Sequence, residues 1–261
     1  MNTNILFFDI DGTILSHRDY NIIDSTKEAI IKAKENGHLT FINTGRTYSL
    51  IGDDVKSMGF DGYVCGCGTA IYYHSELLYH TTIDKKLRKS IILDLMKYNI
   101  GAVLEGNDAI YYTDNIINPG QQQAYQSNTS RGFKVLPWNE EDMIFDKFCI
   151  WIDSQEDIDA FCKIYEDRFD IIDREGIFLE LVPKGHSKAT GIKFLQNILN
   201  IPHDNAFAFG DSLNDLSMLQ YVKHSVGMGN SEEEIKNMVS FLTKDVDEDG
   251  IAHALRHFQM I

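Results

Sequence analysis

Two short polar stretches of this chain carry aspartates at spacings that suit chemistry. The stretch DIDGT places Asp9 and Asp11 two residues apart, and the stretch FGDSLNDL places Asp211 and Asp215 four residues apart. Like charges this close repel each other unless a cation lies between them or one carboxyl group is protonated. Mg²⁺ suits such oxygen ligands, because it combines one or two carboxylates with water and substrate phosphate. The two stretches together therefore predict a magnesium site.

The second stretch also permits another interpretation, because its GDSL segment looks like the nucleophile block of a family of serine esterases. A serine nucleophile needs a histidine base and an orienting acid, and esterases of that type end in Asp-x-x-His. None of the histidines after Ser212 has an acidic residue three positions earlier. We therefore interpret Ser212 as a small turn residue that lets Asp211 and Asp215 face the metal.

The elements around these residues alternate between strand and helix. Residues 4–9 form an apolar run that ends in an acid, which is typical of a buried parallel strand. A helix is predicted at 24–37, a strand at 38–45, a second helix at 47–59 and a third strand at 61–66. Such a β-α-β-α-β series implies a doubly wound parallel sheet.

The rhythm changes in the middle of the chain. Strand-like runs stand close together with few helices, which suggests an α+β unit with an antiparallel sheet. The polar, irregular segment 115–139 receives no predicted element, and the strand-helix alternation returns after it, from residue 187. The predicted fold class is therefore α/β, with a Rossmann-like core in residues 1–81 and 185–261 and an inserted cap domain in residues 82–184.

In open α/β sheets, ligands bind beyond the carboxyl ends of the strands. The polar residues that follow the predicted core strands are therefore expected at one edge, with a lysine that opens the helix before the last of these strands. They are Asp9, Asp11, Gly12, Thr13, Thr44, Gly45, Arg46, Lys188, Asp211, Asn214 and Asp215.

The charge and composition of the chain limit the binding partners and the cellular location that can be expected. The net charge of −15 disfavours nucleic acid and anionic membranes, but it leaves room for a small anionic molecule at a locally positive site. The apolar run ILFF near the start is far too short to cross a bilayer, and no basic region of a secretion signal precedes it. Four sparse cysteines form no disulfide framework, so a reducing cytoplasm is the expected location.

Four of these stretches, in this order, resemble the motifs of the haloacid dehalogenase (HAD) superfamily phosphatases: DIDGT, NTGR, the lysine of GHSKATGIKFL, and GDSLNDLSML. The insert between the second and third motifs, with VGMGNSEEEIK and DEDGIAHAL near the end, resembles the Cof-type sugar-phosphatase branch, whose α/β cap is of type IIB. The core resemblance covers about residues 4–79 and 185–255, and the cap matches only in position and in its strand-helix pattern.

The resemblance implies a role for each catalytic residue. Asp9 would be the nucleophile that takes the phosphoryl group as an aspartyl phosphate. Asp11 would protonate the leaving alkoxide and then deprotonate the attacking water. Lys188 and the Thr44 hydroxyl, with the backbone amides after Asp9, would offset the repulsion between the carboxylate and the phosphate.

The resemblance also implies the binding residues. Mg²⁺ would be held by Asp9, the carbonyl of Asp11, Asp211, and Asp215 either directly or through water. Asn214 would touch the phosphoryl group or the water molecules on the metal. The expected phosphate-binding and substrate-binding residues are Gly12, Gly45, Arg46, Asn214 and Asn230. For Arg46, a surface ion pair with Asp53 or Asp54 is the alternative.

One departure from the family pattern concerns the substrate. Relatives in this branch usually have Asn-Gly-Ala after the third strand, where this chain has Cys67, Gly68 and Thr69. A thiol is a poor hydrogen-bond donor, so Thr69 is a candidate for the contact that the asparagine would make. The predicted cap contains tyrosines and glutamines that suit sugar recognition or simple packing: Tyr111, Tyr112, Tyr125 and Gln121 to Gln123.

These observations predict a cytoplasmic, Mg²⁺-dependent phosphomonoesterase. Its expected substrates are small phosphorylated metabolites, either sugar phosphates or phosphorylated cofactors, and it would be a monomer or a homodimer. A phosphomutase that holds the aspartyl phosphate for a sugar hydroxyl is one alternative. A non-catalytic sensor of phosphorylated metabolites is another, although a sensor has no need to keep both Asp9 and Asp11.

Overall fold

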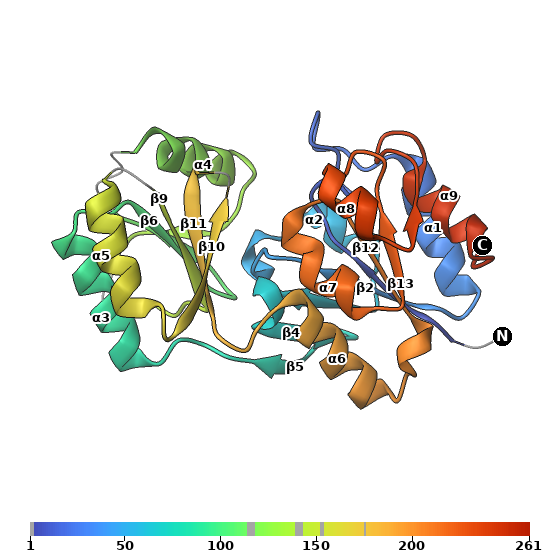
Figure 1. Ribbon diagram of the computed structural model, residues 1–261, viewed down its shortest axis with the longest axis horizontal. Coiled ribbons are helices and arrows are strands. Elements are labelled where there is room, and N and C mark those ends of the chain that lie inside the picture. Colours follow the sequence, from blue (N-terminus) through green and yellow to red (C-terminus); the bar gives the residue numbers. More distant parts are fainter. Residues whose placement is uncertain (1–2, 114–117, 139–142, 152–153, 175) are drawn as a thin grey trace. The chain divides into compact units, whose positions relative to one another are not determined.

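The computed structural model describes residues 3–113, 118–138, 143–151, 154–174 and 176–261, and it divides into two compact units (Figure 1). Unit 1 comprises Met1–Gly45, Asp53–Tyr79 and Ser187–Ile261, and unit 2 comprises Arg46–Gly52 and His80–His186. Residues 46–52, which the sequence analysis assigned to the core, therefore group with unit 2.

Unit 1 is built on an eight-stranded sheet in the order β14-β13-β12-β1-β2-β3-β4-β5. The strands from β14 to β3 are parallel, and β4 pairs with β3 in the antiparallel direction. The chain runs from β1 to β2 on one side and later places β12 on the other side, so the winding reverses at β1. The predicted doubly wound α/β core is confirmed. The bounds are β1 Ile5–Phe8, β2 Leu39–Asn43, β3 Gly62–Cys65, β4 Ala70–Tyr73, β5 Glu76–His80, β12 Ala206–Gly210, β13 His224–Gly227 and β14 Phe241–Leu242.

Apolar side chains fix the central strand of unit 1. All four residues of β1 are buried, and Ile5 and Phe7 pack against Ile192 of α6 and Met218 of α7. Burying one such side chain stabilises the fold by about 1.5–3 kcal/mol. This strand is therefore fixed in position, and so is Asp9, which directly follows it. On the other side of the unit, α1 and α9 lie side by side (Figure 1). The helices are α1 Asp24–Glu35, α2 Asp53–Lys56, α6 Lys188–Leu199, α7 Leu216–Tyr221, α8 Glu233–Met238 and α9 Gly250–His257.

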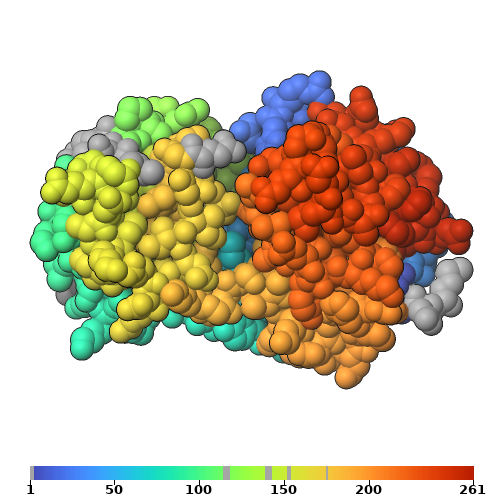
Figure 2. All heavy atoms as spheres, viewed as in Figure 1, coloured from blue at the N-terminus to red at the C-terminus, as the bar shows by residue number. Residues whose placement is uncertain are grey.

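Unit 2 has a six-stranded sheet in the order β10-β11-β9-β6-β7-β8. Its pairs are antiparallel except for β7 with β8, which confirms the predicted α+β character. One face packs against α3 and α5 through residues such as Leu95, Phe148 and Phe161, and α5 forms part of the surface of the unit (Figure 2). The bounds are α3 Lys85–Lys97, β6 Ala102–Glu105, β7 Ile110–Tyr112, α4 Pro119–Ser130, β8 Val135–Leu136, β9 Lys147–Trp151, α5 Gln155–Tyr165, β10 Phe169–Arg174 and β11 Phe178–Pro183.

Two segments differ from the sequence-based expectations. The single helix predicted at 47–59 is instead a 3₁₀ turn at Tyr48–Leu50 followed by the short helix α2, because Ile51 is extended and Gly52 follows it. The segment 115–139, for which no element was predicted, contains the helix α4; residues 115–117 and 139 lie outside the described residues. Among the helices of the described residues, none has the length and hydropathy needed to cross a membrane.

Candidate active site

The carboxyl ends of β1 and β12 bring three buried carboxylates together. Asp9 follows β1 directly and Asp211 follows β12, and these two strands pair in parallel register. Asp215 lies in the 3₁₀ turn Leu213–Asp215. One carboxylate oxygen from each of Asp9, Asp211 and Asp215 lies within 4.8 Å of the other two, and all three residues are buried.

The ammonium group of Lys188 contacts two of these carboxylates. Its Nζ lies 2.7 Å from Asp9 Oδ1, 2.6 Å from Asp215 Oδ1 and 2.8 Å from Asn214 Oδ1. Only 1% of the lysine is exposed. The position of the lysine is fixed because it begins α6, whose N-cap residue Ser187 exchanges hydrogen bonds with Thr190. The structure therefore brings Asp9, Lys188, Asn214 and Asp215 together from three separate parts of the sequence.

The charges in this group do not balance, since three carboxylates share one ammonium group among the described residues. The pKa of Asp9 is raised to about 7, first by burial and then by the neighbouring carboxylate of Asp215, while Lys188 opposes the rise. Burial also raises the pKa values of Asp211 and Asp215. For Lys188, burial alone would lower the pKa, but the carboxylates of Asp215 and Asp9 outweigh it and raise the pKa above its usual value. The group therefore holds more negative charge than its own lysine can neutralise.

Two glycines permit the close approach of these carboxylates. Gly12 has a φ of +73°, and a Cβ atom there would lie 2.2 Å from Asp211 Oδ2. A Cβ on Gly210 would lie 2.6 Å from the Cγ of Asp215. Any larger residue would force the carboxylates apart. The Oδ2 atom of Asp215 also accepts hydrogen bonds from the backbone N–H groups of Asp211 and Ser212, at 2.9 and 3.2 Å, which fixes its orientation.

The remaining predicted residues of the first motif lie on the loop after β1. Asp11 is half-buried, its backbone forms a bridge with Leu15, and its charge contributes to the raised pKa of Asp9. Asn230 donates from Nδ2 to the carbonyl of Gly12 at 2.8 Å, and its Oδ1 accepts from the backbone N–H of Val246 at 2.9 Å. The side chain of Asn230 thus holds the Gly12 turn in place.

The predicted residues after β2 separate at Gly45. Thr44 is buried and belongs to unit 1, where its backbone N–H donates to Val64 at 2.9 Å and its carbonyl accepts from the N–H of Cys67 at 3.1 Å. Gly45 is the last residue of this part of unit 1. Arg46 groups with unit 2, where its Nη1 donates to the carbonyl of Leu50 at 3.2 Å.

Two residues that contact Asp211 were not predicted to have a role. The Thr13 hydroxyl donates to Asp211 Oδ1 at 3.1 Å, and His17 Nε2 lies 3.6 Å from Asp211 Oδ2. This contact is the first cause of the raised pKa of His17. Thr13 could have been assigned from its place in DIDGT, but nothing in the sequence marks His17, because its contact depends on how the loop after Gly12 folds.

Several other residues proved to be packed. Thr69, a candidate for substrate contact, is buried, as Asp9 and Lys188 are. Gln121 is buried and bonds to Ala102 and Thr113, and Tyr112 accepts from Asn128 and stacks edge-on against Tyr125. These cap residues therefore pack within unit 2.

The histidines that follow Ser212 bond or stack elsewhere. His224 pairs with the carbonyl of Asp204, His253 pairs with Thr243, and His257 stacks on Phe241. This arrangement disfavours the esterase interpretation of GDSL.

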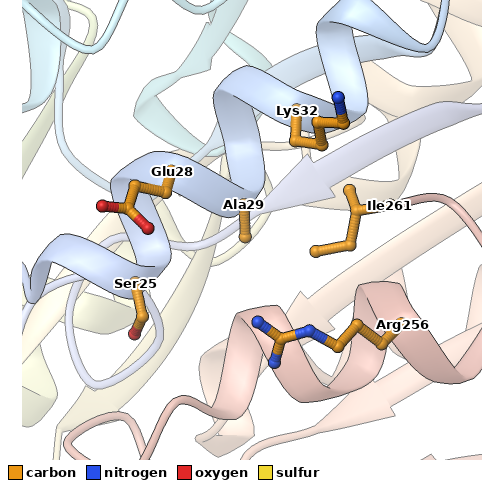
Figure 3. Close-up of a pocket in the computed structure, with 6 residues that line it drawn as sticks. All are labelled: Ser25, Glu28, Ala29, Lys32, Arg256 and Ile261. Atoms are coloured by element: carbon orange, nitrogen blue, oxygen red, sulfur yellow. The ribbon is translucent and has the colours of Figure 1, made fainter.

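A groove of about 310 Å³ lies on another part of unit 1, between α1 and α9 (Figure 3). Glu28 and Lys32 on α1 and Arg256 on α9 give it both acidic and basic groups (Figure 3). Its lining residues are Ser25, Glu28, Ala29, Lys32, Arg256 and Ile261. No predicted site residue is among them, so the groove is separate from the carboxylates at the strand ends.

A doubly wound α/β fold with buried aspartates and a lysine beyond its strand ends defines a class of enzymes that act on phosphate groups. Residues 6–255 match the model of the haloacid dehalogenase-like hydrolase family, and the chain belongs to that family. The predicted resemblance is thereby confirmed, and the chain is a phosphatase.

Individual relatives agree with this assignment. The chain is 27% identical to phosphatase YwpJ of Bacillus subtilis, covering 97% of this chain and 99% of the relative. It is 26% identical to the 5-amino-6-(5-phospho-D-ribitylamino)uracil phosphatase YitU of the same organism, covering 97% of each. The solved structure of the HAD subclass IIB sugar phosphatase BT4131 superposes with a TM-score of 0.83 at 25% identity, covering 99% of this chain and 100% of that one.

Proposed function

We propose that this phosphatase is a Mg²⁺-dependent phosphomonoesterase that acts through an aspartyl phosphate on Asp9. The observation that carries the proposal is the contact of Lys188 with both Asp9 and Asp215, at 2.7 and 2.6 Å, inside a buried group with two more carboxylates than ammonium groups. This excess of negative charge calls for a bound cation, which would also offset the charge of an anionic phosphate ester.

The donor set fits Mg²⁺. Three carboxylates within 4.8 Å of one another offer the hard oxygen ligands that this ion prefers. Asp9, Asp211 and Asp215 would hold it, together with the backbone carbonyl of Asp11. When bound, Mg²⁺ would supply positive charge that lowers the pKa of Asp9 and offsets its repulsion from the phosphate. Without compensation, one pair of unit charges at 4 Å costs about 4 kcal/mol at an effective dielectric of about 20.

The residues of the chain then divide the reaction between them. An oxygen of Asp9 attacks phosphorus and forms the acyl phosphate, while the bond to the ester oxygen breaks and Asp11 gives that oxygen a proton. Asp11 next takes a proton from water, which attacks phosphorus and releases phosphate and the Asp9 carboxylate. Lys188 holds Asp9 in place and neutralises part of the charge, and Thr44, Gly12, Gly45, Arg46 and Asn214 would bind the phosphoryl group.

The substrate is proposed to be a sugar phosphate or a phosphorylated cofactor, in the cytoplasm. Two of the relatives support this class, since one acts on a phosphorylated ribityl compound and the other is a sugar phosphatase. The net charge of −15 gives no support to nucleic acid or anionic membrane as a partner. A monomer or a homodimer remains our proposal for the oligomeric state.

The test is phosphate release from p-nitrophenyl phosphate and from a panel of sugar phosphates and phosphorylated cofactors, with Mg²⁺ or with EDTA. Activity should require Mg²⁺, disappear in Asp9→Asn and survive in Ser212→Ala, which is the matched control for the esterase interpretation. An acid-quenched reaction with ³²P-labelled substrate should leave label on the protein that hydroxylamine removes. Loss of activity only in Ser212→Ala would overturn the proposal. A labelled protein that loses its phosphoryl group only when a sugar with a free hydroxyl is added would indicate a mutase.

A further inference from the structure

The chain passes from unit 1 to unit 2 directly after Gly45. Thr44 is tied to β3 by the hydrogen bond from its N–H to Val64, and it belongs to unit 1 with Gly45. Arg46–Gly52 belongs to unit 2, although the chain then returns to unit 1 at Asp53. A seven-residue stretch between two parts of unit 1 is therefore held by the other unit, and particular side chains must hold it.

Ser49 and Leu50 make the attachments. The Ser49 hydroxyl donates to the carbonyl of Gly106, at the turn between β6 and β7, at 2.7 Å. Leu50 is 8% exposed and packs in a cluster with Val103, Tyr112 and Trp151, on the sheet face opposite α3 and α5. A hydrogen bond and a buried leucine fasten the segment to the sheet of unit 2 at adjacent residues.

Arg46 is held by the same segment. Its Nη1 donates to the carbonyl of Leu50 at 3.2 Å, and the turn between the two residues is closed by the hydrogen bond from the N–H of Leu50 to Thr47 at 2.9 Å. Consecutive Cα atoms are about 3.8 Å apart, so the backbone of Arg46 is no more than about 8 Å from that of Thr44. The guanidinium group that follows the phosphate-binding threonine is thus anchored to unit 2.

We propose that Ser49 and Leu50 are positioning residues for Arg46: they fasten the segment Arg46–Gly52 to the sheet of unit 2, and the Leu50 carbonyl then holds the guanidinium group. Substrate affinity then depends on how unit 2 holds this segment. The inference rests on the proposed function in one respect: Arg46 must meet the phosphoryl group of the substrate.

Steady-state kinetics on p-nitrophenyl phosphate with Mg²⁺ test the proposal. Ser49→Ala and Leu50→Ala should each raise KM about 3- to 10-fold, the effect of losing one ordering contact, with kcat nearly unchanged. Ser49→Thr and Leu50→Met keep the hydroxyl and the apolar contact, so they should restore most of the affinity. In an Arg46→Ala background, adding Leu50→Ala should leave KM where Arg46→Ala alone puts it.

The control is Leu95→Ala, which removes a buried leucine from the opposite face of the same sheet. It should lower thermal stability and leave KM unchanged. An equal rise of KM in Leu95→Ala, additive effects of Leu50→Ala and Arg46→Ala, or an unchanged KM in Arg46→Ala would each overturn the inference.

A second measurement separates this inference from the proposed function. A wild-type protein that hydrolyses no phosphate ester would contradict the proposed function alone. The affinity of the same variants for inorganic phosphate with Mg²⁺, measured by calorimetry, would still follow the same order if Ser49 and Leu50 position Arg46. Equal phosphate affinity in the wild type and all variants would overturn the inference.

Discussion

Each unit of the molecule buries a cluster of charged side chains, and the two clusters are balanced differently. In unit 1, Asp9, Asp211 and Asp215 share a single ammonium group, that of Lys188. Among the described residues of unit 2, the cluster contains two acids and two bases: Lys147 lies 2.9 Å from Glu105 and 2.5 Å from Glu180, and Arg174 also pairs with Glu180. Only the second cluster neutralises itself.

The pKa values report this difference. In unit 2, burial would raise the pKa of Glu180, but the nearby Lys147 and Arg174 outweigh it and lower the pKa to about 2. In unit 1, burial and Asp215 raise the pKa of Asp9 to about 7 despite the contact with Lys188. In a cluster with equal numbers of acids and bases, the bases stabilise the ionised acids. In a cluster with excess carboxylates, the carboxylates repel one another, and a bound cation can reduce that repulsion. A strongly raised carboxyl pKa of this kind is typical of a functional site.

The largest expected effect comes from removing the proposed nucleophile. Asp9→Asn should reduce phosphatase activity at least about 1,000-fold, because an amide does not form the acyl phosphate. Its thermal stability should be equal to that of the wild type or higher, since one unbalanced charge is lost. Activity assays and thermal unfolding of the same preparation check both expectations. Retained activity would remove Asp9 from the mechanism, and a large loss of stability would mean that its charge is structural.

The balanced cluster should respond in the opposite way. Lys147→Met removes the ammonium group that contacts both Glu105 and Glu180, and breaking such a buried pair costs about 3–5 kcal/mol. The control is Lys163→Met, whose exposed pair with Glu166 should be worth less than about 1 kcal/mol. Denaturant unfolding measures both. Similar stabilities of the two variants would show that the unit 2 cluster is not a structural element.

Acid should weaken unit 2 through Glu180. Its folded pKa of about 2 lies below the usual value of 4.5, so the stabilisation is fully present above about pH 4.5 and is lost as the pH falls toward 2. The shift corresponds to about 3 kcal/mol. Unfolding experiments between pH 6 and pH 2 should show this loss in the wild type and a smaller loss in Glu180→Gln, which has no carboxyl group to titrate. Parallel pH profiles would contradict the assignment.

Mg²⁺ should stabilise the unbalanced cluster. At 100 times its dissociation constant, a ligand that binds only the folded state adds about 2.7 kcal/mol. Thermal unfolding with Mg²⁺ or EDTA should show this gain in the wild type and in Glu180→Gln, and it should be absent in Asp211→Asn. A gain in Asp211→Asn equal to that of the wild type would place the cation elsewhere.

The sequence could group Asp9, Asp211 and Asp215 because of one topological rule: residues that follow parallel strands meet at one edge of the sheet. Lys188 begins a helix, and its role was predicted from the family resemblance. The cluster of unit 2 had no such rule. Glu105, Lys147 and Glu180 lie inside three strands whose pairing and register became known only from the structure.

The same reason explains why the attachment of Arg46–Gly52 to unit 2 was not predicted. It depends on a hydrogen bond from Ser49 to Gly106, which is 57 residues away, and on the packing of Leu50 against several strands. The helix α4 was missed for a different reason. Its polar sequence PGQQQAYQSNTS has no clear apolar stripe, and its start is set by Asn118, whose side chain accepts from the N–H groups of Gly120 and Gln121.

The smallest expected effect on stability concerns residues with a positive φ angle, in which the two units also differ. Among the described residues of unit 2, positive φ is confined to Asn99 and three glycines, whereas unit 1 places Cys67 at φ 55° and ψ 37°. A left-handed conformation costs an ordinary residue about 1–2 kcal/mol, and asparagine tolerates it better. The N–H of Cys67 donates to the carbonyl of Thr44, so this strained residue supports the proposed phosphate-binding threonine.

Cys67→Asn should therefore raise the free energy of unfolding by about 1 kcal/mol, while Cys67→Ala, which removes the thiol but keeps the backbone cost, should not. Thermal unfolding of the three proteins measures the difference. Equal stability of Cys67→Asn and Cys67→Ala would show that the backbone at residue 67 stores no strain. A gain in Cys67→Asn with unchanged KM would show that the strain does not serve substrate binding. A gain accompanied by a changed KM would mean that unit 1 keeps both its unbalanced charge and its strained backbone for the same site.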